Sequence, residues 1–528
     1  MKSINKISLI LLTISIIWGC EDNLLDTNIE PINNNLPALS SLNSVDGLTT
    51  FSRSMYDFLA TDDVFQDIGN ENESPMLWFT YGYHETMGDV MTMPWGNFGG
   101  RWVNQAASVT LDDGSVVNPP EGGPQPGEIA KRNDRAAGSD NAIQYEWRDM
   151  YSLIVQGNTV IRALQDLSAT DAEKQAFNAW ATWWKAYAYH RLGSLYEQGV
   201  INENNIIDNP NPVTSNTFVA NTQLIEKSNS LLDELSTIIG SISDDDAFNS
   251  RLSNLQLAYL RSDAVITKNN LIENINTLRA RNLIYNTKVI DMSNANWNDI
   301  ISWTNLGVSN NRNAFIMKTE STFIGENWLP DAVFGFWYFP SDRLIQDINP
   351  GDERLDRYFT NTRSGFPFPN PRGRGIHYGA SYFWKDSQIA STNLGQVTMF
   401  YAGSYEENQL LLAEAKVHTG DIEGGLGHLD AVRNFQNSGL PATVGTMLTE
   451  EQALEEIRKE RRLALIMRSV SFYDARRYGV AAGSRTGARV LDTDGNLNTN
   501  ATINYGYLEY WPVPTFESDF NSTSPTPL

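Results

Sequence analysis

The chain has 528 residues, which is long enough to bury a large apolar core, and it contains a single cysteine. An intrachain disulfide is therefore excluded, and stability must come from packing. The 39 Lys and Arg residues face 63 Asp and Glu residues, a formal net charge of −24. Nucleic acid and anionic lipid surfaces are poor partners for such a chain, because both are bound through clustered cationic side chains.

The first twenty residues have the pattern of an export signal. Lys2 and Lys6 precede an apolar run over residues 7–17, and the only cysteine, Cys20, follows shortly after it. The run is shorter than the roughly 20 residues that span a bilayer, so we expect removal of residues 1–19. The four residues that end at Cys20 resemble the lipobox of bacterial lipoproteins, which implies lipidation of this thiol. An ordinary signal peptide with an incidental cysteine is the alternative.

A tether and an irregular insertion are expected next. Residues 20–41 are polar and rich in Pro and Asn, which predicts a flexible link between lipid and folded domain. A helix is expected over Leu48–Leu59. Residues 69–138 are rich in Gly, Pro, Asn and aromatic residues without a sustained period. An irregular insertion of this length inside a folded chain is commonly functional.

Helical patterning returns after the insertion. The apolar spacing predicts helices over Glu146–Leu167, Gln223–Ile239 and Leu252–Tyr285. Thr170 and Glu173 form a capping box before another helix, in which apolar residues recur every three or four positions. Residues 286–400 are again loop-rich and aromatic.

The third helical block is the clearest. Tyr405–His418 and Ile422–Phe435 predict two short antiparallel helices with Ala and Gly where they approach, which resembles a tetratricopeptide hairpin. Thr449 and Gln452 cap the next helix. After it, residues 490–496 predict a β-hairpin turn.

Two charged segments near the C-terminus, Glu460–Leu463 and Phe472–Gly479, follow each other closely. Together they resemble the signature of the SusD/RagB family of nutrient-uptake lipoproteins, an ERRLEL helix followed by an FDLRRWG-like segment. Further matches, in family order, are Asp352–Leu355, Asn408–Ala415, Leu429–Arg433 and Trp511–Pro514. The chain departs from the family between the two halves of the signature, where Arg468–Ser471 replaces an acidic residue, Gly and a basic residue.

This resemblance implies a mainly α, SusD-like fold. We expect a single domain over residues 42–528, built from about four tetratricopeptide-like helical hairpins. A loop-rich ligand face would be formed by residues 69–138 and 286–400. The resemblance further implies an outer-membrane lipoprotein that binds a nutrient and lies on a SusC-like TonB-dependent transporter, and the acidic Glu21 and Asp22 favour exposure at the cell exterior.

The charged residues of the signature are interpreted as structural. They are expected to form an ion-pair network made of Glu460, Arg461, Arg462, Asp474, Arg476 and Arg477. No catalytic residue, metal or cofactor is expected, since the five His are scattered and no HExxH motif occurs. The acidic turn at residues 490–496 could bind calcium, but it lacks the offsets of an EF-hand. Carboxylates are so numerous that the sequence leaves a glycosidase pair open.

The ligand platform is expected among aromatic and amide residues of the two irregular regions, because sugars combine C–H-rich faces with hydroxyl edges. The candidates are Trp78, Tyr81, Trp95, Asn97, Trp102, Trp328, Trp337, Tyr338 and Trp384. Trp95 and Trp328 are favoured, and for any single ring a place in the core is the competing interpretation. The acidic charge favours a neutral glucan or fructan. A peptide-binding member of the same family and a helical-repeat scaffold for another protein are the alternative functions.

Overall fold

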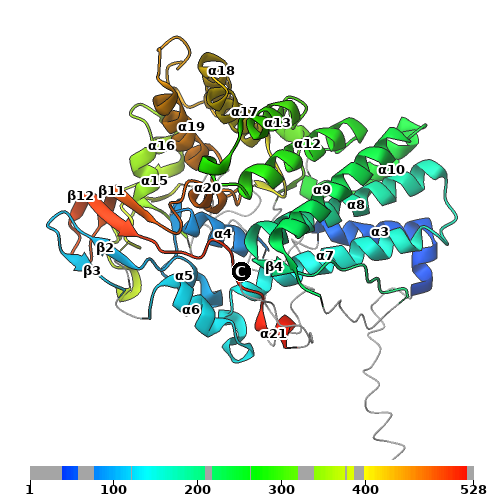
Figure 1. Cartoon of the computed structure of the whole chain (residues 1–528), viewed down its shortest axis with the longest axis horizontal. Helices are drawn as coiled ribbons and strands as arrows, with labels where there is room; N and C mark the ends of the chain where they lie inside the picture. Colours follow the sequence, from blue (N-terminus) through cyan, green and yellow to red (C-terminus); the bar gives the residue numbers. More distant parts are fainter. Residues whose placement is uncertain are drawn as a thin grey trace, which may run out of the picture.

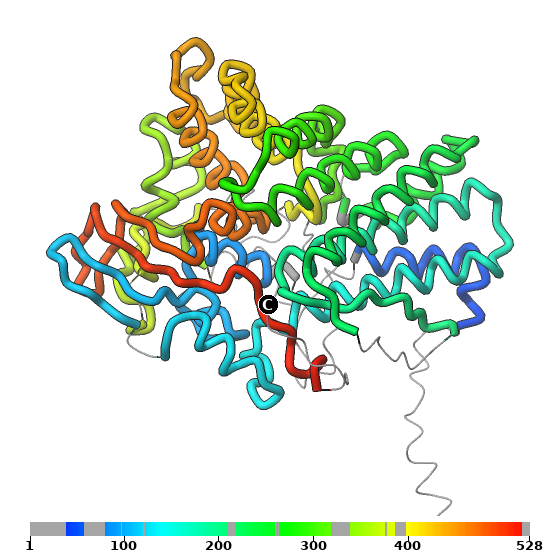
Figure 2. The backbone as a smooth tube through the Cα atoms, viewed as in Figure 1, coloured from blue at the N-terminus to red at the C-terminus, as the bar shows by residue number. Residues whose placement is uncertain are grey.

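The structure, a computed structural model, describes residues 39–57, 77–119, 122–208, 217–261, 263–318, 338–374, 377–385 and 398–519. Long helices fill one side of the molecule and continue as a curved stack to the opposite end (Figure 1). The colour gradient of Figure 2 shows that this stack follows chain order from the N-terminal to the C-terminal helices. Among the helices of the described residues, none combines the length and the apolar character needed to span a bilayer.

The N-terminal helices confirm most of the predicted pattern. They are α3 (Val45–Asp57), α7 (Ile143–Ala163), α8 (Asp171–Leu195) and α9 (Asn221–Gly240). The predicted capping box starts α8, since Glu173 N–H donates to Thr170 Oγ1 at 3.3 Å and Thr170 N–H donates to Glu173 Oε2 at 3.1 Å. Trp180, Trp183 and Trp184 of this helix are buried, so α8 is a central helix of the core.

The prediction of one continuous helix over Leu252–Tyr285 is wrong, because the chain leaves the helical conformation within this range. It forms α10 (Asp245–Leu255), α11 (Ala258–Arg261) and α12 (Lys268–Tyr285). The buried Gln256 side chain accepts from Ile266 N–H at 2.8 Å, and Thr267 caps α12. A buried side-chain amide that accepts a hydrogen bond from a backbone N–H competes with the backbone hydrogen bonds that would continue the helix.

The C-terminal helices form the predicted hairpin. They are α13 (Asn294–Thr304), α17 (Tyr405–His418), α18 (Ile422–Phe435), α19 (Glu450–Ala464), α20 (Ser471–Arg477) and α21 (Thr515–Ser518). α17 and α18 approach closely at Gly425, where a Cβ would lie 2.6 Å from the Ala413 carbonyl oxygen. Only glycine fits this contact, in agreement with the tetratricopeptide-like interpretation.

The region 69–138 is more regular than expected. It contains α4 (Leu77–Met87), α5 (Gly100–Val103) and α6 (Gln125–Arg132). Residues 80–87 of α4 are all buried, and a helix that is buried all round has no apolar stripe for sequence periodicity to detect. The second irregular region contains α15 (Asp342–Asp347) and α16 (Glu353–Tyr358).

A four-stranded antiparallel sheet of order β11-β12-β2-β3 lies at one end of the molecule (Figure 1). Its strands are β2 (Ser108–Thr110), β3 (Val116–Val117), β11 (Ser484–Leu491) and β12 (Leu497–Asn504). The predicted hairpin turn is confirmed between β11 and β12. There Asp492 Oδ1 accepts from the N–H groups of Asp494 at 2.9 Å and Asn496 at 2.8 Å, so this carboxylate serves the turn.

Short antiparallel pairs connect the remaining segments. The strands are β1 (Met91–Thr92), β4 (Gln198–Gly199), β5 (Val219–Ala220), β6 (Ile316–Lys318), β7 (Phe339–Pro340), β8 (Phe359–Thr360), β9 (Phe383–Trp384) and β10 (Thr398–Phe400). β1 pairs with β7, with Thr92 opposite Phe339. One core cluster of buried apolar side chains extends along the chain from Leu42 to Val513.

Candidate functional site

The two irregular regions meet in space. The pairing of β1 with β7 joins residues 91–92 to residues 339–340, and Ser341 N–H donates to the Val90 carbonyl at 3.0 Å. Aromatic side chains gather at this junction. Trp95 lies edge-on against Phe339 at a centroid distance of 6.1 Å, and Phe339 also contacts Phe368 at 6.0 Å.

Three of the predicted ligand rings belong to the core. Tyr81, Tyr338 and Trp384 are at most 5% exposed. Tyr81 Oη donates to the Phe400 carbonyl at 2.9 Å, and Trp384 Nε1 donates to the Tyr338 carbonyl at 2.7 Å. Because their polar atoms are satisfied inside and no ring face is open, the ligand prediction is wrong for these three residues.

Two further candidates are half-buried and already in contact with arginine. The Arg372 guanidinium lies 4.7 Å from the Trp95 ring centroid, and Arg372 itself has a left-handed backbone with φ of 59°. Arg101 and Arg132 lie 4.0 and 3.6 Å from the Trp102 ring centroid. A sugar that stacked on either tryptophan would compete with these cation–π contacts.

The remaining candidates are not placed by the structure. Trp78 is part of α4 and Asn97 of the 3-10 helix Asn97–Gly99, but their side chains lie outside the described residues. Trp328, Trp337 and Cys20 lie outside the described residues altogether. Their ligand and lipidation roles therefore stay predictions.

A cleft of about 640 Å³ opens beside the last helical hairpin, which is formed by α17 and α18. It is bounded by α16, β6, β10, the end of α18, and the connection between α19 and α20, which are far apart in sequence. The described residues at its wall are Asp263, Asn311, Arg312, Ile316, Arg357, Tyr358, Thr398, Phe400, Glu406, Phe435, Gln436, Asn437, Ala464, Ile466, Met467 and Arg468.

Aromatic rings supply the apolar part of this cleft. Phe435, the last residue of α18, is 45% exposed and contacts the Tyr405 ring at a centroid distance of 4.8 Å. Tyr358 at the end of α16 is half-buried. Phe400 forms part of the floor, with the Arg468 guanidinium 3.8 Å above its ring centroid. The cleft therefore combines ring faces with directional polar groups, the pair of features that sugar binding requires.

The polar rim of the cleft is held in place by hydrogen bonds. Gln436 Oε1 accepts from Arg354 Nη1 at 3.0 Å, and Gln436 Nε2 donates to the Ala464 carbonyl at 3.0 Å. Arg468 donates to both oxygens of Glu406 at 2.9 and 3.1 Å. Burial opposes ionisation of Glu406, but the Arg468 charge outweighs it and lowers the pKa of this carboxyl.

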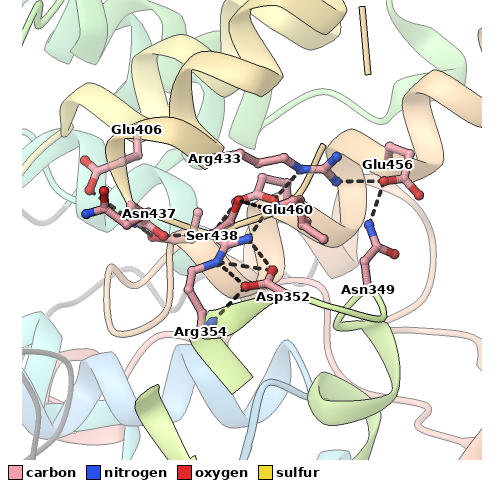
Figure 3. A network of polar contacts seen from close by, with 12 residues as sticks. Asn349, Asp352, Arg354, Glu406, Arg433, Asn437, Ser438, Glu456 and Glu460 are labelled. Atoms are coloured by element: carbon pink, nitrogen blue, oxygen red, sulfur yellow. Dashed lines mark hydrogen bonds and ion pairs between the residues drawn. The ribbon is translucent and has the colours of Figure 1, made fainter. Parts of the chain in front are cut away.

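A network of ion pairs lies next to the rim of the cleft, and its Arg354 is the hydrogen-bond donor to Gln436 (Figure 3). Arg354 is fully buried between Asp352, which accepts from Nη2 at 2.7 Å, and Glu460, which accepts at 3.0 Å. Arg433 joins Glu460 at 3.0 Å to Glu456 at 2.7 Å. Burial of Arg354 is offset by the carboxylates of Glu460 and Asp352, which raise its pKa.

The signature residues confirm the predicted ion-pair network, with one exception. Asp474 bridges Arg461 at 2.8 Å and Arg477 at 2.8 Å, and Arg477 also binds Glu414. Arg462 pairs with Asp347 at 2.7 Å. Arg476 instead donates to the backbone carbonyls of Ser194, Tyr285 and Glu509, so its predicted ion-pair role is wrong.

Three of the seven non-glycine residues with a positive φ in the described parts of the chain lie at or next to the cleft. Asn437, Met467 and Ser469 have positive φ values of 50°, 59° and 59°. Such conformations cost about 1–3 kcal/mol each in non-glycine residues, and they cluster at ligand sites. The prediction missed this cleft, although the departure of Arg468–Ser471 from the family pattern was visible in the sequence and lies at its wall.

Within the described residues, no three or more His, Cys, Asp or Glu side chains are grouped so that they could hold a metal ion. His84 and His190 are both buried and hydrogen-bonded, to Glu146 at 3.0 Å and to Asn282 at 2.8 Å.

Comparison with known proteins identifies the fold. No protein-family model and no curated protein matches the sequence. Among solved structures, a SusD-like carbohydrate binding protein from Bacteroides vulgatus ATCC 8482 superposes with a TM-score of 0.57 at 13% identity, covering 91% of this chain and 97% of its own. A SusD homolog from Bacteroides fragilis NCTC 9343 gives 0.57 at 12% identity, covering 90% and 94%. A SusD-like carbohydrate binding protein, also from Bacteroides fragilis NCTC 9343, gives 0.55 at 15% identity, covering 91% and 99%. The chain therefore has the SusD-like fold that its C-terminal motifs predict.

Proposed function

We propose that the protein captures an oligosaccharide or polysaccharide in the cleft beside the last helical hairpin and passes it to a SusC-like TonB-dependent transporter. The observation that carries this proposal is the combination of half-exposed rings, Phe435 and Tyr358, with amide and guanidinium groups that other residues already orient. Two of the fold relatives are themselves described as carbohydrate binding proteins, which supports the same ligand class.

The charges at the cleft support a neutral sugar. Arg468 pairs with Glu406 at 2.9 Å, and Arg312 pairs with Asp263 at 3.2 Å. Arg357 donates to the Gln436 and Asn437 carbonyls at 3.1 and 2.7 Å. Since these cations already have acceptors, a neutral polymer such as a glucan or fructan meets the least competition.

Binding without turnover fits the two carboxylates of the cleft. A glycosidase needs a carboxylic acid with a raised pKa to protonate the leaving group. The pKa of Glu406 is lowered by its ion pair with Arg468, and Asp263 is 68% exposed and paired with Arg312. Neither of these two carboxylates has the environment of such a proton donor.

Isothermal titration against neutral polysaccharides, acidic polysaccharides and peptides tests the proposal. We expect binding to a neutral glycan, no released sugar, and an affinity for Phe435→Ala that is weaker by about 1–3 kcal/mol, by analogy with ring stacking on bases. Leu306→Ala is the matched control, because Leu306 is 62% exposed and lies outside the cleft. Binding to peptides only would favour the peptide-capturing alternative, and product sugars would contradict the proposal.

The earlier candidate Trp95 is tested in the same titration. Loss of affinity in Trp95→Ala but not in Phe435→Ala would move the site from the cleft to the junction of the two irregular regions. If neither variant changed the affinity, both site assignments would be wrong while glycan capture remained.

The cellular location is part of the proposal. Lipidation of Cys20 would hold the protein on the outer membrane, facing the cell exterior. Cys20→Ala should release the protein into the soluble fraction, and a variant that stayed fully membrane-bound after high-salt washing would contradict the anchor. Protease treatment of intact cells tests the exposed orientation.

A further inference from the structure

Met467 and Arg468 form one wall of the cleft and begin a strained turn of residues 467–471, called here the Arg468 turn. Met467 and Ser469 both have a φ of 59°, so two of its five residues are left-handed without being glycine. Arg468 lies between them and reaches over the Phe400 ring at 3.8 Å while it binds Glu406. The turn therefore decides where the cleft presents its guanidinium group.

A buried carboxylate accepts hydrogen bonds from two residues of the turn. Glu85 of α4 is fully buried. Its Oε1 accepts from Ser469 N–H at 2.9 Å, and its Oε2 accepts from the Ser471 hydroxyl at 2.9 Å. A second bond, from Arg191 Nη1 to Ser469 Oγ at 3.0 Å, fixes the same turn from α8.

We propose that Glu85 is a positioning residue of the cleft: its ionised carboxylate holds the Arg468 turn, and ligand affinity falls when this carboxylate takes up a proton. The part that concerns ligand affinity rests on the proposed glycan binding in the cleft. The part that concerns the turn stands on the geometry alone.

The chemistry follows from the two acceptor positions. An ionised carboxylate accepts both the Ser469 amide and the Ser471 hydroxyl, whereas a carboxylic acid uses one oxygen as a donor. Protonation leaves the number of bonds unchanged, because the acid donates to Ser471 Oγ while the Ser471 hydroxyl turns to the His84 carbonyl at 3.0 Å. The Ser469 amide then donates to a neutral acid, and a hydrogen bond to a charged acceptor is roughly twice as strong as one to a neutral acceptor. Weakening of this bond to the turn corresponds to roughly a threefold to tenfold change in an equilibrium constant.

The surroundings of Glu85 place this change near neutral pH. Burial raises the pKa of Glu85 to about 7, against the hydrogen bonds of Ser471 and Ser469 and the charge of Arg462 from α19. Beside it, burial lowers the pKa of His84, and Arg191 and His84 outweigh burial to lower the pKa of Glu146 to about 2. Burial lowers the pKa of Arg476 of α20, the next charged group, but an arginine remains cationic near neutral pH.

Asp149 of α7 is the competing buried acid. Both of its oxygens lack a hydrogen-bond partner, and burial raises its pKa well above the usual value, with the nearby Glu146 charge acting in the same direction. The Arg468 turn makes no hydrogen bond to Asp149, so its titration would leave the turn in place. Asp149→Asn is therefore the matched control for Glu85→Gln.

The binding test uses the full-length protein and the polysaccharide that binds it most tightly, titrated at pH 8 and pH 6. We expect the wild-type affinity to fall roughly threefold to tenfold at pH 6. Glu85→Gln should bind equally at both pH values, and Asp149→Asn should keep the wild-type fall. A pH dependence that survived in Glu85→Gln, or vanished in Asp149→Asn, would overturn the proposal.

A second variant and a ligand-free measurement separate this proposal from the proposed function. Ser471→Ala removes one donor to the carboxylate, so the midpoint of the affinity change should move to higher pH. The Met467 methyl signal, assigned with Met467→Leu, should shift between pH 6 and 8 in the wild type and not in Glu85→Gln. If no glycan bound at any pH but this shift appeared, the proposed function would fail and the hold of Glu85 on the turn would stand. An absent shift would overturn the positioning role.

Discussion

The helices α19 and α20 and the cleft beside them use the same residue types for different purposes. In α19 and α20, Arg461 and Arg477 are buried and share Asp474 as a partner. In the cleft, Arg312 is 77% exposed, and the Phe435 ring is 45% exposed. The first region stabilises the fold, whereas the second leaves ring faces and polar atoms accessible to a ligand.

The physical reason for this difference is desolvation. A buried charge that loses its partner keeps the cost of having left water, but an exposed charge regains water when its partner is removed. A substitution in α19 or α20 should therefore change the melting temperature, and one in the cleft should change the affinity. Four predictions test this comparison.

The largest effect is expected for Asp474→Ala, which leaves Arg461 and Arg477 without their shared carboxylate. Removing one partner of a buried ion pair costs about 3–5 kcal/mol, so the urea midpoint and the melting temperature should both fall. A surface control is Asp233→Ala, whose partner Arg279 lies 2.6 Å away and whose own side chain is 74% exposed. A variant that melted like the wild type but lost all ligand binding would contradict the structural role of the signature.

Two buried carboxyls, Glu146 and Glu85, should contribute to the pH dependence of stability with opposite signs. The pKa of Glu146 is lowered from 4.5 to about 2, so its contribution of about 3 kcal/mol is present above pH 4.5 and is lost as the pH falls towards 2. The pKa of Glu85 is raised to about 7, so stability is also lost as the pH rises from 4.5 through 7.

Urea unfolding at intervals from pH 3 to pH 8 measures this profile. The stability of the wild type relative to Glu85→Gln should fall as the pH rises from 4.5 through 7, while the loss towards pH 3 should appear in both proteins. A difference between the two proteins that stayed constant up to pH 8 would contradict the predicted cost of the ionised Glu85.

Two neighbouring rings should respond in opposite ways. Tyr358 is half-buried at the cleft, whereas Phe359 is 2% exposed in the core. Tyr358→Ala should weaken glycan binding by about 1–3 kcal/mol with little change in melting. Phe359→Ala should cost about 3–5 kcal/mol of stability because it leaves a cavity. Titration and calorimetry on both variants measure the contrast, and a Tyr358→Ala protein that melted early with unchanged affinity would reverse it.

The smallest effect is expected for Arg312→Ala. Arg312 and Asp263 are both mostly exposed, and an ion pair of this kind contributes about 0–1 kcal/mol. Stability should hardly change, and affinity for a neutral glycan should vary little with salt. A marked loss of affinity that was restored at low ionic strength would indicate an acidic ligand.

Prediction from the sequence succeeded where the pattern was local. The capping boxes at Thr170 and Thr449, the α17–α18 hairpin and the hairpin turn at Asp492 all appear in the structure. It failed at α4, whose residues from Thr80 onward are buried on all sides, and at Tyr81, Tyr338 and Trp384. The sequence could not separate the two interpretations of these rings, because aromatic residues are common both in protein cores and in ligand-binding platforms.

The sequence by itself determined the capped starts of α8 and α19, the close contact at Gly425 and the charged signature, because each depends on neighbours within a few residues or on a contact that only one residue type allows. Only the tertiary structure decided which rings are exposed and that Phe435, Tyr358 and Arg468 share one cleft. Those residues come from separate segments, and their distances depend on packing across the whole core. The same holds for Glu85, whose pKa is raised by burial. Its hydrogen-bond donors, Ser469 and Ser471, lie more than 380 residues further along the chain.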